Sequence, residues 1–478
     1  MLTYSFTGIT DNLYEHLYKC IRDDVLSGSL PADYKLPSKR SFAKNLSVST
    51  ITVENAYNQL MSEGFIYSLP RKGFYVSEIF PGEYPAPETE SSDETTHKPL
   101  SSFSSDSDYD VTGHSTSYRV DFSSNNTSPD SFPFTTWAKL TRRILSDSRD
   151  KLMTNSPSNG TLELRMAIAE YLKEFRGIYT SPDNIIVGAG TEYLYTILLQ
   201  LLGGGMTYAI EKPGYRKLSM ILDTVGIKSV DIPVDDKGLN VDILRRSNAD
   251  IVHVTPSHHF PTGITMPVKR RYELLKWAQE ADTPRYIIED DYDSEFRLTG
   301  RPIPPLFGMD SSHVIYMNTF TKSLTSTIRI SYMVLPDELA ARYRERLSFY
   351  SCTVSNFEQL TLAAFISEGY FEKHINRMRT AYRRKRDCIL DAIKKSPLDS
   401  VSEIKEEDAG LHFIINLKTE LADNEVTDRL RKAGINLLPL SYYGSETTHS
   451  FLINYSSVPM DDINNIIESI SEELNSDS

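Results

Sequence analysis

The chain contains few cysteines, and they are not spaced as in disulfide or metal-binding motifs. The 478 residues contain three cysteines, Cys20, Cys352 and Cys388, which lie far apart and form no Cys-x-x-Cys pair. An odd number of isolated thiols is typical of a reducing compartment and excludes a disulfide framework. The same spacing excludes the usual cysteine-based zinc sites, and we expect no bound metal.

Long apolar runs and a leader sequence are also missing. The most apolar stretch, residues 193–210, contains Gln200 and three consecutive glycines. It falls short of the ~20 apolar residues that a membrane-spanning helix needs. The N-terminus has acidic residues early and no apolar core of a signal peptide. We therefore expect a cytoplasmic protein that does not cross a membrane, with a buried helix and a turn in residues 193–210.

Positive charge is in deficit. The chain has 51 lysines and arginines against 65 aspartates and glutamates, which gives a net charge of -14 at pH 7. This balance argues against a protein coated in basic surface, so any DNA-binding patch must be local. The chain is also longer than the ~250–300 residues over which a single core grows, so we expect at least two domains.

The composition divides the chain into three segments. Residues 79–119 are rich in serine, aspartate, glutamate, threonine and proline and have few apolar side chains to bury. This composition predicts a flexible acidic linker. The linker separates an N-terminal domain, residues 8–78, from a large domain, residues 120–478.

The N-terminal segment has the pattern of a winged helix-turn-helix. Apolar residues recur at helical spacing up to Gly28, Ser38 opens a short helix, and Ser49 is the expected N-cap of a third helix that ends at Gly64. In residues 65–76 apolar and polar side chains alternate, which predicts a β-hairpin. The order helix, helix, turn, helix, hairpin predicts an α+β DNA-binding domain.

Basic and short polar side chains gather where such a domain meets DNA. Lysine and arginine contact phosphates, while the start of the recognition helix reads base edges. The alternative is a small helical domain with ordinary surface lysines. The expected DNA contacts are Lys39, Arg40, Ser49, Thr50, Thr52, Asn55, Arg71 and Lys72.

The stretch LPSKRSFAKNLSVSTITVENAYNQLMSEGFIYSLPRKGFYV, residues 36–76, resembles the GntR-type winged-helix domain of bacterial repressors. The match includes the LPSxR opening, the VSxxTV helix start, the ExGxI exit and a wing that contains glycine. The resemblance implies sequence-specific binding to promoter DNA.

The third segment alternates strand-like apolar runs with helical patterns, which predicts an α/β domain with a mainly parallel sheet. Such sheets bind ligands at the carboxyl ends of their strands, so the turns after the strands should hold the chemistry. The expected strands are residues 185–187, 207–210, 251–255, 286–289 and 314–317.

Each turn taken alone is ambiguous. Residues 187–192 are small enough for a helix N-terminus to approach a phosphate, but such turns also serve packing. Residues 211–216 and 257–263 could be plain turns. The acids in 289–293 could ligate a metal, pair with arginine or act on a cofactor. The lysine in 319–322 could be a surface lysine or a Schiff-base lysine.

Together, and in this order, these turns resemble the fold-type I pyridoxal-phosphate enzymes of the aspartate aminotransferase superfamily, over nearly all of residues 120–478. The resemblance implies pyridoxal 5'-phosphate as cofactor. Lys322 would carry its aldehyde as a Schiff base, Asp290, chosen over Asp291, would hold the pyridine nitrogen protonated, and Tyr292 would donate to the ring hydroxyl. The remaining implied contacts of the cofactor and its phosphate are Ala189, Gly190, Thr191, Tyr215, Thr319, Thr321 and Arg329.

Two positions depart from the enzymes of that superfamily. Phe260 occupies a turn position where many aminotransferases have asparagine, and residues 451–455 contain no arginine to grip a substrate carboxylate. The second departure argues against amino-acid transamination and leaves Arg216 as the candidate for an anionic group on an effector. We expect His258 and His259 to line the pocket rather than bind metal.

The whole chain resembles the MocR/GabR family of bacterial regulators, in which a GntR-type reader is fused to an aminotransferase-like domain. The resemblance implies a homodimer, with each reader lying against the partner's large domain, and a response to the cofactor alone or to an amine or amino acid. Two alternatives remain open: an active aminotransferase that carries a DNA reader, and a pyridoxal-phosphate sensor that controls vitamin B6 synthesis.

Overall fold

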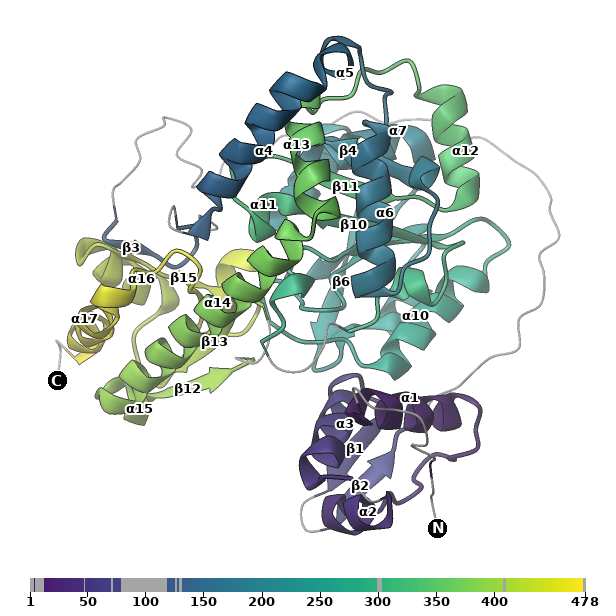
Figure 1. Ribbon diagram of the computed structural model, residues 1–478. Helices are drawn as coiled ribbons and strands as arrows, with labels where there is room; N and C mark the ends of the chain where they lie inside the picture. The colour runs from purple at the N-terminus through teal and green to yellow at the C-terminus, as the bar shows by residue number, and fades with distance from the viewer. Residues whose placement is uncertain are drawn as a thin grey trace.

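A computed structural model of the chain describes most of the two predicted folded segments. The described residues are Tyr4 and residues 13–46, 48–69, 72–78, 118–124, 127–128, 131–298, 303–406 and 410–475. They form a winged-helix unit, a central sheet unit and a C-terminal unit (Figure 1). The predicted linker lies outside the described residues except for Tyr118 and Arg119, so its flexibility and the exact domain limits stay predictions.

The winged-helix unit has the predicted order of elements. It contains α1 (Leu13–Leu26), α2 (Lys39–Leu46) and α3 (Thr50–Ser62), followed by a hairpin of β1 (Ile66–Leu69) and β2 (Gly73–Val76). The apolar faces of the three helices and the hairpin enclose one small core.

Local signals set both ends of α3. The Ser49 side chain accepts a hydrogen bond from the Thr52 backbone N–H at 3.0 Å, so the predicted N-cap is confirmed. The helix gives way to Gly64, whose φ of +79° lies in the left-handed region that favours glycine. Between these ends Val53, Ala56 and Leu60 are fully buried against the other helices.

The central sheet unit is built on eight strands in the order β4-β11-β10-β9-β8-β5-β6-β7. The five strands from β10 to β6 are parallel to their neighbours, and β11, β4 and β7 join in antiparallel fashion. The mainly parallel sheet is therefore confirmed. The strand bounds are β4 (Ile185–Gly188), β5 (Tyr208–Lys212), β6 (Ser229–Asp235), β7 (Gly238–Leu239), β8 (Ile251–Val254), β9 (Tyr286–Asp290), β10 (Val314–Thr319) and β11 (Ser331–Val334).

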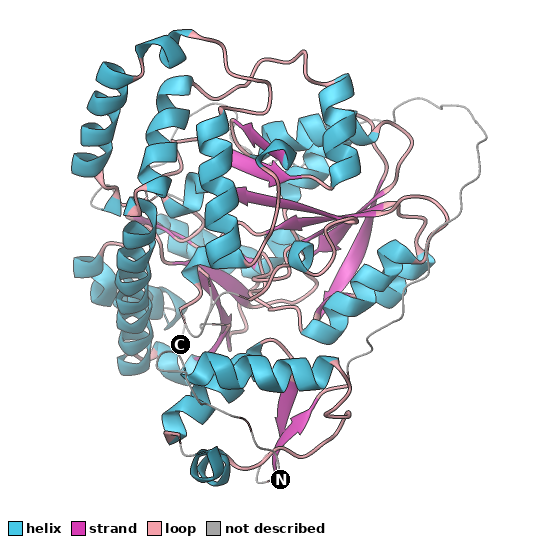
Figure 2. Cartoon of the chain, turned by 45° about the vertical axis from the view of Figure 1, so that its right-hand side comes forward, coloured by secondary structure: helices cyan, strands magenta, loops and turns pink. Residues whose placement is uncertain are grey.

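Helices cover both faces of this sheet (Figure 2). Successive strand residues therefore enter different cores: Ile185 and Val187 belong to one apolar cluster, and Ile186 belongs to another. Burial on both faces explains why the strands are continuous apolar runs. The helices of this unit are α4 (Phe134–Asp147), α5 (Arg149–Met153), α6 (Leu162–Arg176), α7 (Thr191–Leu202), α8 (Arg216–Thr224), α9 (Val241–Arg246), α10 (Val268–Gln279), α11 (Phe320–Ser323), α12 (Asp337–Arg346) and α13 (Asn356–Ser367).

The long helix α14 (Tyr370–Lys395) leads from the sheet unit to the C-terminal unit (Figure 1). There a four-stranded sheet has the order β12-β13-β16-β15, and β3 pairs with β14. The elements of this unit are β3 (Val120–Asp121), α15 (Leu398–Val401), β12 (Ser402–Lys405), β13 (His412–Leu417), α16 (Asp423–Lys432), β14 (Ile435–Asn436), β15 (Leu438–Pro439), β16 (Ser450–Asn454) and α17 (Ile463–Asn475).

Among the helices of the described residues, none combines the length and apolar character that crossing a membrane requires.

Candidate functional site

The predicted site residues of the large domain meet at one edge of the central sheet. Asp290 ends β9, Lys322 lies in α11 directly after β10, and Gly190 follows β4. Because these strands run in the same direction, their carboxyl ends share this edge. The turn that follows β8, residues 255–266, reaches the same place.

Lys322 is enclosed and faces carboxylates. Burial lowers the pKa of its amine from the ordinary 10.5 to about 8, while the negative charges of Asp293 and Asp290 act in the opposite direction. Its Nζ lies 6.0 Å from the centre of the Tyr292 ring. An amine with this pKa is partly neutral near pH 7, which is the form that attacks an aldehyde.

Asp290 and Asp291 project to opposite sides of the chain. Asp290 accepts a hydrogen bond from the Tyr195 hydroxyl at 3.2 Å through Oδ2, and its buried Oδ1 has no partner among the described residues. Asp291 pairs with Arg176 and accepts a hydrogen bond from the Tyr316 hydroxyl at 2.7 Å. A buried oxygen without a partner on the Lys322 side supports the choice of Asp290 over Asp291 for a ring nitrogen.

Hydroxyls, a glycine and an arginine gather beside the lysine. The hydroxyl oxygens of Thr319 and Thr321 lie 2.9 Å apart. Gly190 has a φ of +94°, and a Cβ at this position would collide with the guanidinium of Arg329. Arg329 in turn pairs with Glu192 at 2.8 Å. These groups suit an anion, because a guanidinium and a helix N-terminus lie at the same spot.

The other predicted cofactor and effector residues lie on α7, on the loop before it, and before and within α8. Thr191 is the first residue of α7, and the Ala189 N–H already donates to the Thr353 hydroxyl at 3.0 Å. Tyr215 packs against the core cluster that contains Tyr195.

Arg216 reaches toward the C-terminal unit. Its guanidinium lies 4.7 Å from the ring centre of Tyr442, and one of its N–H groups donates to the Tyr442 carbonyl at 3.4 Å. The arginine therefore lies at the junction of the sheet unit and the C-terminal unit.

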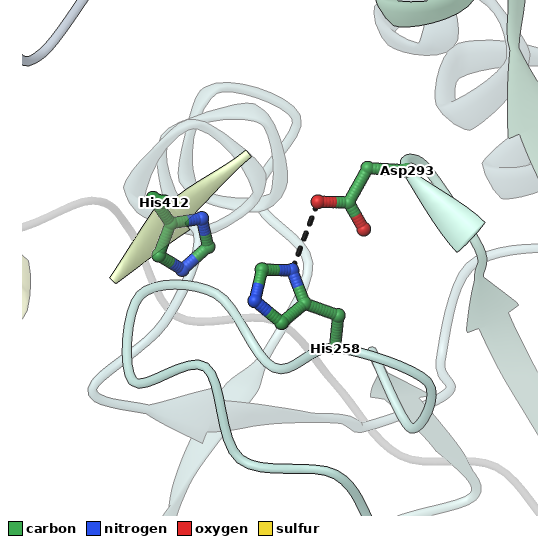
Figure 3. A group of neighbouring side chains, drawn as sticks. All are labelled: His258, Asp293 and His412. Atoms are coloured by element: carbon green, nitrogen blue, oxygen red, sulfur yellow. Dashed lines mark hydrogen bonds and ion pairs between the residues drawn. The ribbon is translucent and has the colours of Figure 1, made fainter. Parts of the chain in front are cut away.

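A histidine–aspartate cluster beside Lys322 went partly unpredicted. The Nδ1 of His258 lies 2.8 Å from Asp293 and 3.2 Å from the Tyr292 hydroxyl, and the ring of His412 lies 4.3 Å from that of His258 (Figure 3). The nearest ligand atoms of His258, Asp293 and His412 fall within 4.8 Å of one another. The Nδ1 of His258 therefore has two hydrogen-bonding neighbours, and the cluster forms part of the wall beside Lys322. No sequence signal pointed to His412, because it is a single histidine in an apolar strand.

The winged-helix unit exposes part of its predicted DNA surface. Arg40, Ser49, Thr50, Asn55 and Lys72 are exposed, whereas Arg71 lies outside the described residues. Three of the predicted contacts have partners within the unit. Lys39 pairs with Glu54 at 2.7 Å, and the hydroxyls of Ser49 and Thr52 lie 2.8 Å apart at the helix cap.

Comparison with known proteins identifies the family. Residues 13–76 match the bacterial regulatory proteins of the gntR family. The uncharacterized HTH-type transcriptional regulator YdeL of Bacillus subtilis (strain 168) is 37% identical over 463 residues, which cover 94% of each chain. The probable rhizopine catabolism regulatory protein MocR of Rhizobium meliloti is 32% identical over 93% of this chain and 90% of that protein. The chain belongs to the MocR-type transcriptional regulators. The expected GntR-type reader and regulatory function are thereby confirmed.

Solved structures confirm the fold of the large domain of this MocR-type regulator. The kynurenine aminotransferase of Pyrococcus horikoshii is 23% identical and superimposes with a TM-score of 0.65 over 76% of this chain and 92% of that one. An archaeal alanine:glyoxylate aminotransferase, also 23% identical, gives a TM-score of 0.67 over 75% and 91%. At this level of identity the likeness establishes the aminotransferase fold alone.

Proposed function

We propose that this regulator binds pyridoxal 5'-phosphate at Lys322 and that the cofactor, alone or with an amine or amino acid, controls its sequence-specific binding to promoter DNA. The observation that carries the proposal is the placement of the enclosed Lys322 amine beside a carboxylate oxygen of Asp290 that lacks a partner. Neither feature is needed for folding, since each costs free energy in the absence of a ligand.

The residues at the sheet edge fit this cofactor. When bound, pyridoxal 5'-phosphate supplies an aldehyde that reacts with an amine and a ring that withdraws electrons. Lys322 would hold the cofactor, Asp290 would keep a proton on the ring nitrogen, and Tyr292 would donate to the ring hydroxyl. The phosphate would lie against Ala189, Gly190, Thr191, Thr319, Thr321 and Arg329, with Tyr215 beside the ring.

The geometry favours a regulator over a working aminotransferase. The strand β16 presents Phe451, Leu452 and Ile453, all buried, and no arginine that could grip a substrate carboxylate. Arg216, at the junction with the C-terminal unit, is the proposed contact for an anionic group of the effector. We further propose that the regulator acts as a homodimer, with its readers exchanged between subunits.

The test of the cofactor site is the visible absorption band that forms when pyridoxal 5'-phosphate is added, followed by borohydride reduction and peptide mapping. We expect a band in the wild type, modification at Lys322 and no band in Lys322→Ala. Lys385 provides a matched control, because burial also lowers its pKa to about 8 but its amine donates to the Ser456 carbonyl. Lys385→Ala should keep the band. A wild-type protein without a band contradicts the proposal.

The test of the reader is binding to promoter fragments at several salt concentrations. We expect Arg40→Ala to weaken binding to all sequences. It should also reduce the slope of the logarithm of the binding constant against the logarithm of the salt concentration by about one. We expect Asn55→Ala to relax the preference at one position, at a cost of about 1–3 kcal/mol. Binding that depends on salt but shows no sequence preference contradicts the proposal.

A second candidate function is sensing of pyridoxal 5'-phosphate itself. The HTH-type pyridoxine biosynthesis transcriptional regulator PdxR of Corynebacterium glutamicum is 28% identical over 98% of this chain and 96% of that protein. In this case the cofactor alone should change promoter binding to its full extent, and added amines should have no effect. An active aminotransferase that carries a DNA reader would show many turnovers with amino and keto acids, and absence of turnover with a broad panel of these acids would remove that alternative.

A further inference from the structure

Two histidines and an aspartate from distant parts of the chain meet beside Lys322 (Figure 3). His258 lies in the turn after β8, Asp293 lies in the turn after β9, and His412 begins β13 of the C-terminal unit. Each of the three residues is at most 3% exposed. One nitrogen or oxygen atom from each lies within 4.8 Å of the other two. The cluster therefore joins the sheet unit to the C-terminal unit.

The backbone on both sides holds the His258 ring in place. Within its own turn, the Gly263 N–H donates to the His259 carbonyl at 2.7 Å. From the C-terminal unit, Gly410 comes so close that a Cβ at this position would lie 1.9 Å from the Cε1 atom of His258. The Gly410 carbonyl is itself held by the Tyr455 hydroxyl, which donates to it at 2.7 Å. The imidazole is therefore positioned before any ligand binds, as a binding site requires.

Each histidine of the cluster has one buried ring nitrogen that makes no hydrogen bond. Neither the Nε2 of His258 nor the Nε2 of His412 has a partner among the residues that the structure describes. The Nδ1 of His258 lies 2.8 Å from the Asp293 carboxylate, so the neutral ring donates there and carries its lone pair on Nε2. A buried polar atom without a partner costs free energy, which a ligand at this position would recover.

The charges beside the cluster are close to balance. The carboxylates of Asp293 and Asp290 both act on Lys322, and Arg297 lines a small cavity together with Asp293. Lys322 also acts on His412, but burial lowers the pKa of its amine to about 8, so that part of it is neutral near pH 7. Two carboxylates thus face two cations, one of which is partly neutral, and a metal ion meets no excess of positive charge.

We propose that His258 and His412 bind a divalent transition-metal ion, Zn²⁺ above all, through their Nε2 atoms. Asp293 holds the Nδ1 of His258, an arrangement that commonly supports a metal-bound histidine. Imidazole nitrogens suit Zn²⁺, and two such ligands leave positions open for water or for a donor atom of a small molecule in the pocket. Two nitrogens at about 2.0–2.1 Å from one zinc ion lie about 3.3 Å apart in tetrahedral geometry, so small side-chain movements within the cluster suffice.

This metal site departs from the expectation, drawn from the sequence, that no metal binds. His412 belongs to the C-terminal unit, so no spacing in the sequence joins it to His258, and only the fold supplies the second imidazole. The site is also independent of the proposed cofactor, because neither Lys322 nor Asp290 is among its ligands.

The test is calorimetric titration of the full chain with Zn²⁺, after removal of metal and of pyridoxal 5'-phosphate. We expect one Zn²⁺ ion per chain in the wild type. Asp293→Asn should weaken binding about 10- to 100-fold, the usual effect of losing the group behind a metal-bound histidine, and His412→Gln should weaken it at least as much. Visible absorption with Co²⁺ in place of Zn²⁺ reports on the ligands directly, and its bands should be lost in His412→Gln.

His313 provides the matched control. Its Nδ1 lies 2.8 Å from Asp310, as that of His258 does from Asp293, but it belongs to no three-residue cluster of metal-binding groups within the described part of the chain. His313→Gln should therefore keep the affinity of the wild type. If His412→Gln does not fold, His258→Gln and Asp293→Asn decide the matter through the rise in Tm that Zn²⁺ causes in the wild type and that these variants should lose.

Two results overturn the metal site. One is a wild-type protein that binds no stoichiometric Zn²⁺, and the other is wild-type affinity in His412→Gln, which would place the ion elsewhere. Neither result affects the cofactor proposal, because the absorption band of pyridoxal 5'-phosphate is measured separately on metal-free protein.

Discussion

The reactivity of Lys322 toward an aldehyde should depend on pH in a way that the structure specifies. An amine with the ordinary pKa of 10.5 is neutral in about one molecule in 3000 at pH 7, whereas a pKa of about 8 makes about one in ten neutral. Attachment of pyridoxal 5'-phosphate should therefore be about 300-fold faster at pH 7 than with an ordinary lysine. Between about pH 6 and pH 8 the rate should rise about tenfold per unit and then level off.

Replacement of one carboxylate tests the electrostatic cause. Asp293 is the first of the two carboxylates whose charge raises the pKa of Lys322, so Asp293→Asn should lower this pKa further and move the midpoint of the rate profile to lower pH. The assay is stopped-flow absorption of the apo protein mixed with cofactor. His258→Asn removes the histidine that contacts Asp293 but keeps the negative charge of the Asp293 carboxylate. The midpoint of its rate profile should therefore equal that of the wild type. A rate that still rises through pH 10, or an unmoved midpoint in Asp293→Asn, refutes the reasoning.

Three further predictions concern stability and affinity. In the apo protein, Lys322→Met should raise the free energy of unfolding by up to about 3 kcal/mol below pH 8. Because the unfolded state binds the proton more tightly, this gain should vanish as the pH approaches 10.5, which urea unfolding at several pH values will show. Gly190→Ala should weaken cofactor binding about tenfold or more through its positive φ and its clash with a guanidinium, whereas Gly226→Ala, also at positive φ but with free space around it, should cost stability alone; absorption titration distinguishes them. Ser49→Ala should cost the winged-helix unit about 1 kcal/mol in thermal unfolding, and Ser49→Asn, which keeps the cap, should cost little.

Local features of the sequence were sufficient for most elements. Ser49 and Gly64 marked the ends of α3 because a cap hydroxyl and a left-handed glycine act on their own neighbours in the chain. The run at 286–290 predicted a buried strand because a two-sided sheet needs apolar side chains on both faces. The position of Lys322 after β10 followed from the strand, and the cofactor-binding role predicted for it came from the resemblance to aminotransferases.

Features that depend on distant partners were missed. The basic run RMRTAYRRKR, residues 377–386, has the composition of a solvated helix face. Lys385 is nevertheless buried and donates to the Ser456 carbonyl, and Arg379 donates to the carbonyl of Glu295. Lys39, a predicted DNA contact, pairs with Glu54, which no pattern around Lys39 indicates; its contact with DNA stays a prediction. In each case the partner lies far along the chain, and no spacing within the run reveals it.

The sequence by itself determined the two kinds of domain and their order, because helix caps, strand patterns and motif spacing act over short stretches of chain. The candidate residues for the chemistry came from the resemblance to a known superfamily. Only the tertiary structure decided what those residues face. It placed Asp290 toward Lys322 and Asp291 toward Arg176, and it brought His258 together with Asp293 and His412. Side-chain direction and burial come from packing between elements that are distant in sequence, so the environment of a titrating group is settled only when the chain is folded.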